Sequence, residues 1–215
     1  MLVVFDLDGT LIDGYAAIGD ALGYAMRRLG RPEPSSAEVR SMVGHGLERL
    51  LEKAVGPERA AEGVRLFRER YPKVAVEKSE LMPGVPEVLV ALSRRGHAVA
   101  LASNKPPDFS RLILDAKGVG NYFRSVGGPD ARTPPKPDPT MLFRIMKETG
   151  ADPSATVVVG DMEVDAEMAR AAGCRVVLVA GGSRSGKELA ELDADGVLEG
   201  LSELPAWLEK QAAER

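Results

Sequence analysis

The sequence has very little cysteine and no long apolar run. Cys174 is the single cysteine among 215 residues, so an internal disulfide is excluded, which agrees with a reducing compartment. We expect Cys174 to be a small buried side chain without a catalytic role. No apolar run approaches the roughly 18 residues of a membrane span, and no basic and apolar leader precedes the first predicted strand. We therefore expect a cytoplasmic protein with no membrane segment.

The sequence also lacks an excess of positive charge. Its formal net charge is −4, with 28% charged and 44% hydrophobic residues. Surfaces that bind nucleic acid or anionic membranes need clustered positive charge, so neither partner is expected. The length suits one large core, or one core that carries an insertion. The oligomeric state cannot be read from these features.

Two aspartates follow the first apolar segment of the chain. Residues 2–5 form a continuous apolar run, typical of a strand buried on both faces of a parallel sheet. Asp6 and Asp8 come directly after it, followed by Gly9, which permits a sharp turn, and Thr10, which adds a hydroxyl. Ligands bind at this carboxyl edge of open α/β sheets. Two carboxylates there repel each other unless a cation or a shared proton intervenes.

The chain divides into two patterns. Residues 14–81 read as helices, at about 16–29, 47–54 and 58–71, without a convincing strand. From residue 82 onward strands and helices alternate, with strands at about 97–102, 156–159, 175–180 and 196–198. Helices are expected at about 85–95, 107–117, 138–149, 165–172 and 201–213, with Asp138 as N-cap and Pro139 at the first helical position. We predict an α/β fold: a Rossmann-like parallel sheet with helices on both faces, formed by residues 1–13 and 82–215, with a helical domain inserted at 14–81.

Two further loops offer groups that bind phosphate. Ser103 and Asn104 follow the strand that ends at Ala102, where a hydroxyl and free amides can donate to an anion. Lys136 stands between prolines, which hold its ammonium at one place before a helix. Serine and asparagine are also ordinary turn residues, and a lysine between prolines also suits a rigid surface turn. Taken singly, these loops leave both interpretations open.

A fourth loop adds carboxylates at the same sheet edge. Asp161 follows the apolar strand 157–159, and Asp165 lies near the start of the next helix, where it also suits an N-cap. Several carboxylates at one edge favour a hard divalent cation such as Mg²⁺. The two histidines, His45 and His97, lie away from these loops in the sequence, so zinc bound by histidine or cysteine is not expected.

The four segments occur in the order typical of the haloacid dehalogenase-like superfamily, and the chain resembles its aspartyl-phosphate phosphatases. Within that group it is similar to bacterial phosphoglycolate phosphatases. Ser103 stands where threonine is commoner, and Met162-Glu163-Val164 replaces smaller or polar residues. The segments that carry the finer resemblance are Val43-Gly44-His45-Gly46-Leu47, Met82-Pro83-Gly84-Val85, Ser103-Asn104-Lys105-Pro106, Asn121-Tyr122-Phe123, Val126-Gly127-Gly128, Lys136-Pro137-Asp138-Pro139 and Ala171-Ala172-Gly173-Cys174.

The resemblance implies a role for each candidate residue. Asp6 would be the nucleophile that forms an aspartyl-phosphate, and Asp8 the general acid and then the general base. Mg²⁺ would be held by Asp6, the main-chain carbonyl of Asp8 and Asp161. Asp165 and Thr10 would support this metal site without binding the ion themselves. The phosphoryl oxygens would be held by Ser103, Asn104 and Lys136. The inserted helices would form a cap that closes over the site.

The implied activity is Mg²⁺-dependent hydrolysis of a small phosphorylated metabolite, with 2-phosphoglycolate the expected substrate. Cap residues would select it, and His45 and Arg49 are candidates, although Arg49 also suits a solvated helix face. Asp8 argues against a dehalogenase, because such enzymes lack this acid. Phosphomutase, pyrophosphatase and nucleotidase activities on the same scaffold are the alternatives that the sequence leaves open. A phosphoryl-receiver module is disfavoured because its aspartate follows a mid-chain strand, and a non-enzymatic binding protein because both Asp6 and Asp8 are present.

Overall fold

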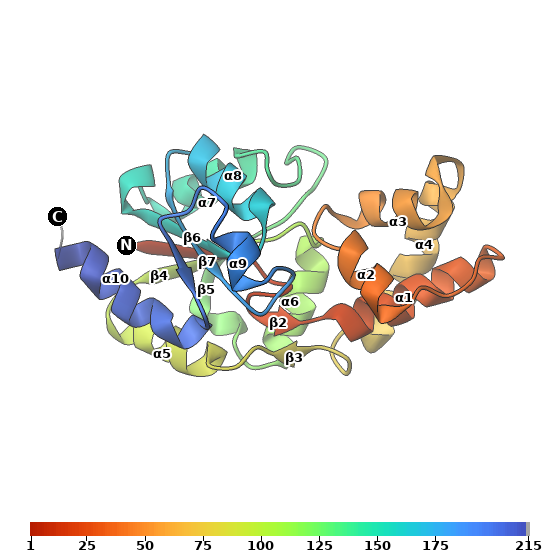
Figure 1. Ribbon diagram of the computed structural model, residues 1–215, viewed down its shortest axis with the longest axis horizontal. Coiled ribbons are helices and arrows are strands. Elements are labelled where there is room, and N and C mark those ends of the chain that lie inside the picture. The colour runs from red at the N-terminus through yellow and green to blue at the C-terminus, as the bar shows by residue number, and fades with distance from the viewer. Residues whose placement is uncertain (214–215) are drawn as a thin grey trace.

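The central element of the fold is a six-stranded parallel sheet. The computed structural model describes residues 1–213. The strands of the sheet are β1 (Leu2–Phe5), β4 (Ala98–Ala102), β5 (Phe123–Gly127), β6 (Thr156–Gly160), β7 (Arg175–Val179) and β8 (Gly196–Leu198). Their order is β5-β4-β1-β6-β7-β8, so β1, the red strand that starts at the N-terminus in Figure 1, lies between β4 and β6. All four residues of β1 are buried, as expected for a strand covered on both faces.

Helices cover both faces of this sheet. Val3 and Phe5 face one hydrophobic cluster, which includes residues of α5 (Val85–Arg94), α6 (Pro107–Ala116) and α10 (Leu204–Ala213). Leu2 and Val4 face a second cluster with α7 (Thr140–Thr149), α8 (Glu163–Ala171) and α9 (Gly186–Leu189). The alternation along β1 follows from the two-residue period of a strand. Short 3-10 helices lie at Gly120–Tyr122, Pro153–Ala155 and Leu201–Glu203.

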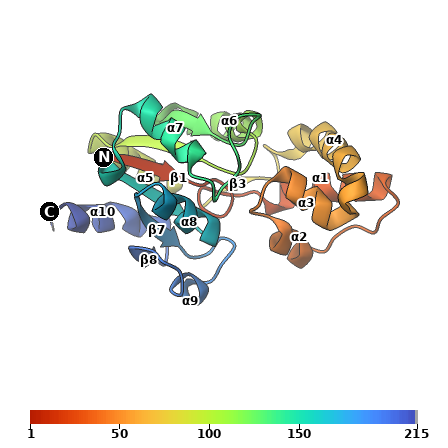
Figure 2. The ribbon, with the colours of Figure 1, turned by 90° about the horizontal axis from the view of Figure 1, so that it is seen from above.

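A group of four helices is inserted after the first strand. These are α1 (Tyr15–Arg28), α2 (Ser36–Met42), α3 (Leu47–Val55) and α4 (Pro57–Val74). They lie together at one end of the molecule, beyond the sheet, in both views (Figures 1 and 2). A two-stranded antiparallel ribbon, β2 (Ile12–Asp13) and β3 (Glu80–Leu81), joins them to the core. The predicted fold class, a parallel sheet with helices on both faces and an inserted helical region, is confirmed. The division into units 1–13 with 82–215 and 14–81 stays a prediction.

Several elements differ from the sequence prediction. Strand β5 was not expected, because Arg124 and Ser125 interrupt its apolar run at the sheet edge. Helix α2 was also not expected, since Val39 is its single buried residue and its apolar stripe is therefore too weak. It is stabilised at its start by a capping box between Ser35 and Glu38. No helix of the described chain is both long and apolar enough to cross a lipid bilayer.

The start of α7 was predicted one residue too early. The helix begins at Thr140 with Pro139 as its N-cap, rather than with Asp138 as N-cap and Pro139 inside the helix. The carboxylate of Asp138 still accepts a hydrogen bond from the Thr140 N–H at 2.9 Å. Asp138 therefore satisfies a free N–H group at the helix start, but from one residue before the N-cap.

Candidate active site

The three central strands deliver the predicted site residues to one edge. Phe5 pairs with Leu101 on β4 and with Val159 on β6. The segments that follow these strands therefore leave the sheet side by side, and they carry Asp6 with Asp8, Ser103 with Asn104, and Asp161. Lys136 reaches the same edge from the loop before α7. The sheet register thus brings together residues that lie up to 155 positions apart in the predicted site.

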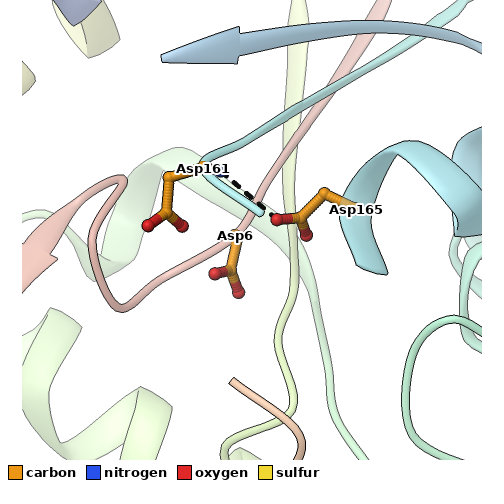
Figure 3. Close-up of side chains that lie close together, drawn as sticks. All are labelled: Asp6, Asp161 and Asp165. Atoms are coloured by element: carbon orange, nitrogen blue, oxygen red, sulfur yellow. Dashed lines mark hydrogen bonds between the residues drawn. The ribbon is translucent and has the colours of Figure 1, made fainter. Parts of the chain in front are cut away.

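Three carboxylates meet at this edge. Single oxygen atoms of Asp6, Asp161 and Asp165 all lie within 4.8 Å of one another, and all three residues are buried (Figure 3). Burial raises the pKa of Asp161, and the charges of Asp6 and Asp165 raise it further. A cation or a shared proton relieves the repulsion between buried like charges of this kind. This cluster can hold a hard metal ion with oxygen ligands.

Lys136 partly neutralises this carboxylate cluster. Its Nζ lies 2.8 Å from Oδ1 of Asp6 and 2.7 Å from Oδ1 of Asp165. The other oxygen of Asp165 accepts hydrogen bonds from the main-chain N–H groups of Asp161 and Met162. Both oxygens of Asp165 are therefore engaged by the protein. Asp165 thus holds Lys136 and the turn before α8, within a cluster of three carboxylates that could hold a metal ion.

The surroundings of Asp161 are closely packed around its carboxylate. The Thr10 hydroxyl donates to Oδ1 of Asp161 at 3.4 Å, and the Ser183 N–H donates to Oδ2. Gly9 has a φ of +88°, and a Cβ at Gly9 or at Gly182 would overlap the Asp161 carboxylate. Glycine is thus required at both positions, since the backbone approaches this side chain too closely for any larger residue. Thr10 thus contacts a carboxylate of the cluster, and its supporting role at a metal site stays a prediction.

Asn104 connects three segments of the site. Its amide accepts a hydrogen bond from the Lys136 N–H at 2.6 Å and donates to the Lys136 carbonyl at 3.2 Å. It also donates to the carbonyl of Gly44, in the inserted region, at 2.9 Å. The side chain of Asn104 therefore holds Lys136 and the inserted region in place. The expected contact of Ser103 and Asn104 with a phosphate stays a prediction; Ser103 is buried at the strand end with its hydroxyl beside the Lys105 N–H.

Asp8 has a different set of neighbours from Asp6. Its Oδ2 lies 2.9 Å from Nζ of Lys105, and that Nζ also donates to the hydroxyl of Tyr71, on α4, at 2.7 Å. Burial raises the pKa of Asp8, although the Lys105 charge opposes this shift. No role was predicted for Lys105 or Tyr71 from the sequence. Lys105 directly follows Ser103 and Asn104, so its place near the site could have been predicted, whereas Tyr71 has the pattern of an ordinary core residue of its helix.

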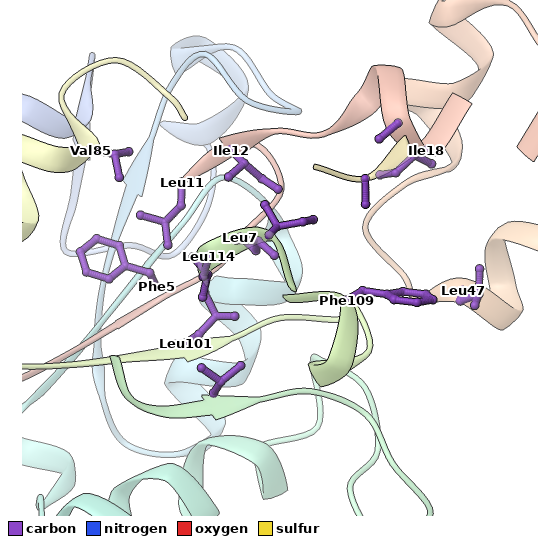
Figure 4. Close-up of a cluster of buried hydrophobic side chains, with 14 of the residues drawn as sticks. Phe5, Leu7, Leu11, Ile12, Ile18, Leu47, Val85, Leu101, Phe109 and Leu114 are labelled. Atoms are coloured by element: carbon purple, nitrogen blue, oxygen red, sulfur yellow. The ribbon is translucent and has the colours of Figure 1, made fainter. Parts of the chain in front are cut away.

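A cavity of about 630 Å³ lies between the sheet edge and the inserted helices and opens to solvent. Its polar side carries Asp6, Asp8, Ser103, Asn104, Lys105 and Lys136. Its opposite side is apolar. Figure 4 shows Phe109 extending from the core toward Leu47 and Ile18 of the inserted region, and all three line the cavity. A ligand at the carboxylates is therefore enclosed by apolar side chains.

The chain matches the family of haloacid dehalogenase-like hydrolases over residues 3–179. It belongs to this family. A phosphoglycolate phosphatase of Pseudomonas savastanoi pv. phaseolicola is 35% identical over 98% of this chain and 81% of its own length. One from Vibrio parahaemolyticus is 34% identical over 94% of this chain and 93% of its own. A crystal structure of a predicted phosphoglycolate phosphatase from Haemophilus somnus superposes with a TM-score of 0.85 at 26% identity, covering 98% and 97% of the two chains.

The remaining candidate residues lie at different distances from the cavity of this hydrolase. Arg49 is exposed on α3 and does not line the cavity. His45, far from the site loops in the sequence, lies in the loop whose Gly44 contacts Asn104, because the inserted helices fold back over the sheet edge. Its role in selecting the substrate stays a prediction. His97 is half-buried at the start of β4, and Cys174 is buried with its pKa raised to about 11 by burial.

Proposed function

We propose that this hydrolase is a Mg²⁺-dependent phosphatase that hydrolyses small phosphate monoesters through an aspartyl-phosphate, with 2-phosphoglycolate as its substrate. The observation that carries the proposal is the separation of two carboxylates on one loop. Asp6 lies beside Lys136 in the carboxylate cluster, and Asp8 lies beside Lys105 with a raised pKa. Two carboxylates in different surroundings suit two different chemical roles.

In the proposed reaction Asp6 and Asp8 divide the work. A carboxylate oxygen of Asp6 attacks phosphorus, and the bond from phosphorus to the ester oxygen breaks. Asp8, whose pKa is raised by burial, would give a proton to the leaving oxygen. Asp8 then takes a proton from a water molecule that attacks the aspartyl-phosphate, which releases phosphate and restores Asp6. One carboxylate could not serve in both roles, since the phosphorylated Asp6 cannot take the proton from the attacking water molecule.

The cationic and polar residues would hold the phosphoryl group during this transfer. Lys136 lies beside Asp6, and the Ser103 hydroxyl at the end of β4 would donate to a phosphoryl oxygen. Asp6 and Asp161, with the main-chain carbonyl of Asp8, would hold Mg²⁺, which lowers the repulsion between carboxylate and phosphate when it is bound. The residues present fit such an ion, because Asp6 and Asp161 are buried beside one another among oxygen donors. Residues 14–81 would act as a cap that excludes water.

A substrate panel tests this proposal. Phosphate release is measured from 2-phosphoglycolate, pyrophosphate, nucleoside monophosphates and sugar phosphates, with Mg²⁺ and with EDTA. We expect Mg²⁺-dependent hydrolysis and a preference of at least about tenfold for 2-phosphoglycolate, equivalent to roughly 1.4 kcal/mol of discrimination. A smaller preference would remove the substrate assignment and leave the phosphatase class.

A matched pair of variants tests the nucleophile. Asp6→Asn should abolish phosphate release, because an amide does not attack phosphorus. Asp152→Asn makes the same chemical change at an exposed position outside the cavity and should retain wild-type activity. If Asp6→Asn turned over like the wild type, the assignment of Asp6 would be wrong.

A further inference from the structure

Lys105 is a buried lysine that the proposed reaction leaves without a role. Its side chain is 6% exposed, and its Nζ contacts Oδ2 of Asp8 at 2.9 Å and the Tyr71 hydroxyl at 2.7 Å. An ammonium group has three N–H donors, and among the described residues these two oxygens are its hydrogen-bonding and ion-pair partners. Lys105 also lines the cavity. The structure thus holds a cation with one donor left for a ligand.

The two lysines of the cavity lie beside different carboxylates. Lys136 contacts Asp6 and Asp165, on the side where the phosphoryl group is transferred. Lys105 contacts Asp8, the group that protonates the leaving oxygen in the proposed reaction. Among the described residues that line the cavity, these two are the cations. Lys105 is therefore the cation placed toward the leaving alcohol rather than toward the phosphoryl group.

The wall that faces the leaving alcohol offers few hydrogen bonds. It is lined by the apolar side chains of Ile18, Leu47, Leu50, Phe67 and Phe109. A leaving group with several hydroxyls, such as a sugar, would lose its water contacts there without gaining partners, which is costly. A small leaving group with one negative charge fits better, because a single fixed cation satisfies it.

We propose that Lys105 binds a carboxylate carried on the carbon next to the ester oxygen, so that the substrate class is that of 2-phosphooxy carboxylates. This inference rests on the proposed phosphatase function and names the residue that recognises its substrate. The carboxyl carbon of such a substrate is two bonds from the ester oxygen, roughly 2.4 Å away on standard bond lengths. Since Asp8 must reach the ester oxygen, an ammonium 2.9 Å from Asp8 is within reach of that carboxylate.

Tyr71 makes this recognition depend on the inserted helices. Its hydroxyl comes from α4, and its ring stacks on Phe67 with ring centroids 5.0 Å apart. The tyrosine is fully buried, so it holds the Lys105 ammonium in one position. The binding residue thus belongs to the sheet edge, and its orientation is set by the inserted region.

Selectivity between two matched esters tests the inference. The kcat/KM values for 2-phosphoglycolate and for ethyl phosphate, which lacks the carboxylate oxygens, are measured for the wild type and for Lys105→Met. We expect the ratio of the two values to fall by about 10- to 100-fold in Lys105→Met, the equivalent of one lost charge-assisted hydrogen bond. Lys105→Arg should recover part of the ratio, and Lys147→Met, at an exposed position, should leave it unchanged.

The result that overturns the inference is an unchanged ratio. If Lys105 acted only through Asp8 or on the phosphoryl group, Lys105→Met would lower both kcat/KM values equally. If Lys105→Met is inactive, the binding of both esters is measured by calorimetry with Mg²⁺. The two proteins compared are Asp6→Asn and the double variant Asp6→Asn with Lys105→Met. An equal loss of affinity for the two esters would again overturn the inference. Absence of phosphatase activity in the wild type would refute the proposed function, while this binding comparison would still decide the role of Lys105.

Discussion

Replacing Lys136 by methionine probes the charge balance of the site most directly. The substitution keeps the length of the side chain and removes the ammonium that lies 2.8 Å from Asp6 and 2.7 Å from Asp165. The side chains of Lys136 and Asp165 are 2% and 1% exposed, so solvent screens this interaction little. Two buried carboxylates then remain without their shared cation.

The expected loss of stability is large. Removing one partner of a buried ion pair costs about 3–5 kcal/mol, because the remaining charge stays buried. For a chain of this size 1 kcal/mol shifts Tm by about 2–4 °C, so Tm should fall by about 6–20 °C. The effect should grow with pH. The Lys136 charge lowers the pKa of Asp165, so without it that pKa rises further above the unfolded value. A raised carboxyl pKa destabilises the folded state progressively as pH rises through it.

Thermal unfolding by circular dichroism at pH 5 and pH 8, without Mg²⁺, measures this effect. Lys147→Met, which removes an exposed ammonium, should shift Tm by no more than about 2 °C. A shift for Lys136→Met equal to that of the control, or one larger at pH 5 than at pH 8, would refute the assignment of Lys136 as the cation that neutralises the cluster.

Three other predictions concern the metal, the inserted region and the proton. Mg²⁺ at about 100 times its Kd should raise the Tm of the wild type by about 5–10 °C. Asp161→Asn should remove this rise. An equal rise in the wild type and in Asp161→Asn would place the ion elsewhere. Gly44→Ala should lower kcat/KM severalfold, because a Cβ there would lie 2.5 Å from the side chain of Met162. Gly30→Ala, also at positive φ but with nothing within 4 Å, should affect stability alone; equal kcat/KM values in the two variants would contradict this contact. Because the Lys105 charge lowers the pKa of Asp8, Lys105→Met should move the alkaline limb of kcat for ethyl phosphate to higher pH, and a shift in the opposite direction would argue against Asp8 as the acid.

Most of the sheet could be predicted from the sequence because its strands are apolar on both faces. The runs 2–5 and 157–159 contain no polar residue, so they were readily predicted as buried strands. Strand β5 and helix α2 were missed for the opposite reason. Strand β5 is mostly buried, but Arg124 and Ser125 interrupt its apolar pattern. Helix α2 buries only Val39 and is stabilised by its capping box.

The sequence by itself determined which carboxylates stand at strand ends. Asp6 and Asp161 follow buried strands, and neighbouring parallel strands end at one edge, so their proximity follows from local pattern alone. Tertiary structure alone decided the partners of each charge. Lys105 meets Asp8 because β1 and β4 are neighbours in the sheet. Lys105 meets Tyr71, and Asn104 meets Gly44, because the inserted helices fold back over the sheet edge. Periodicity reports whether a residue is buried, but the residues it meets depend on how separate elements pack together.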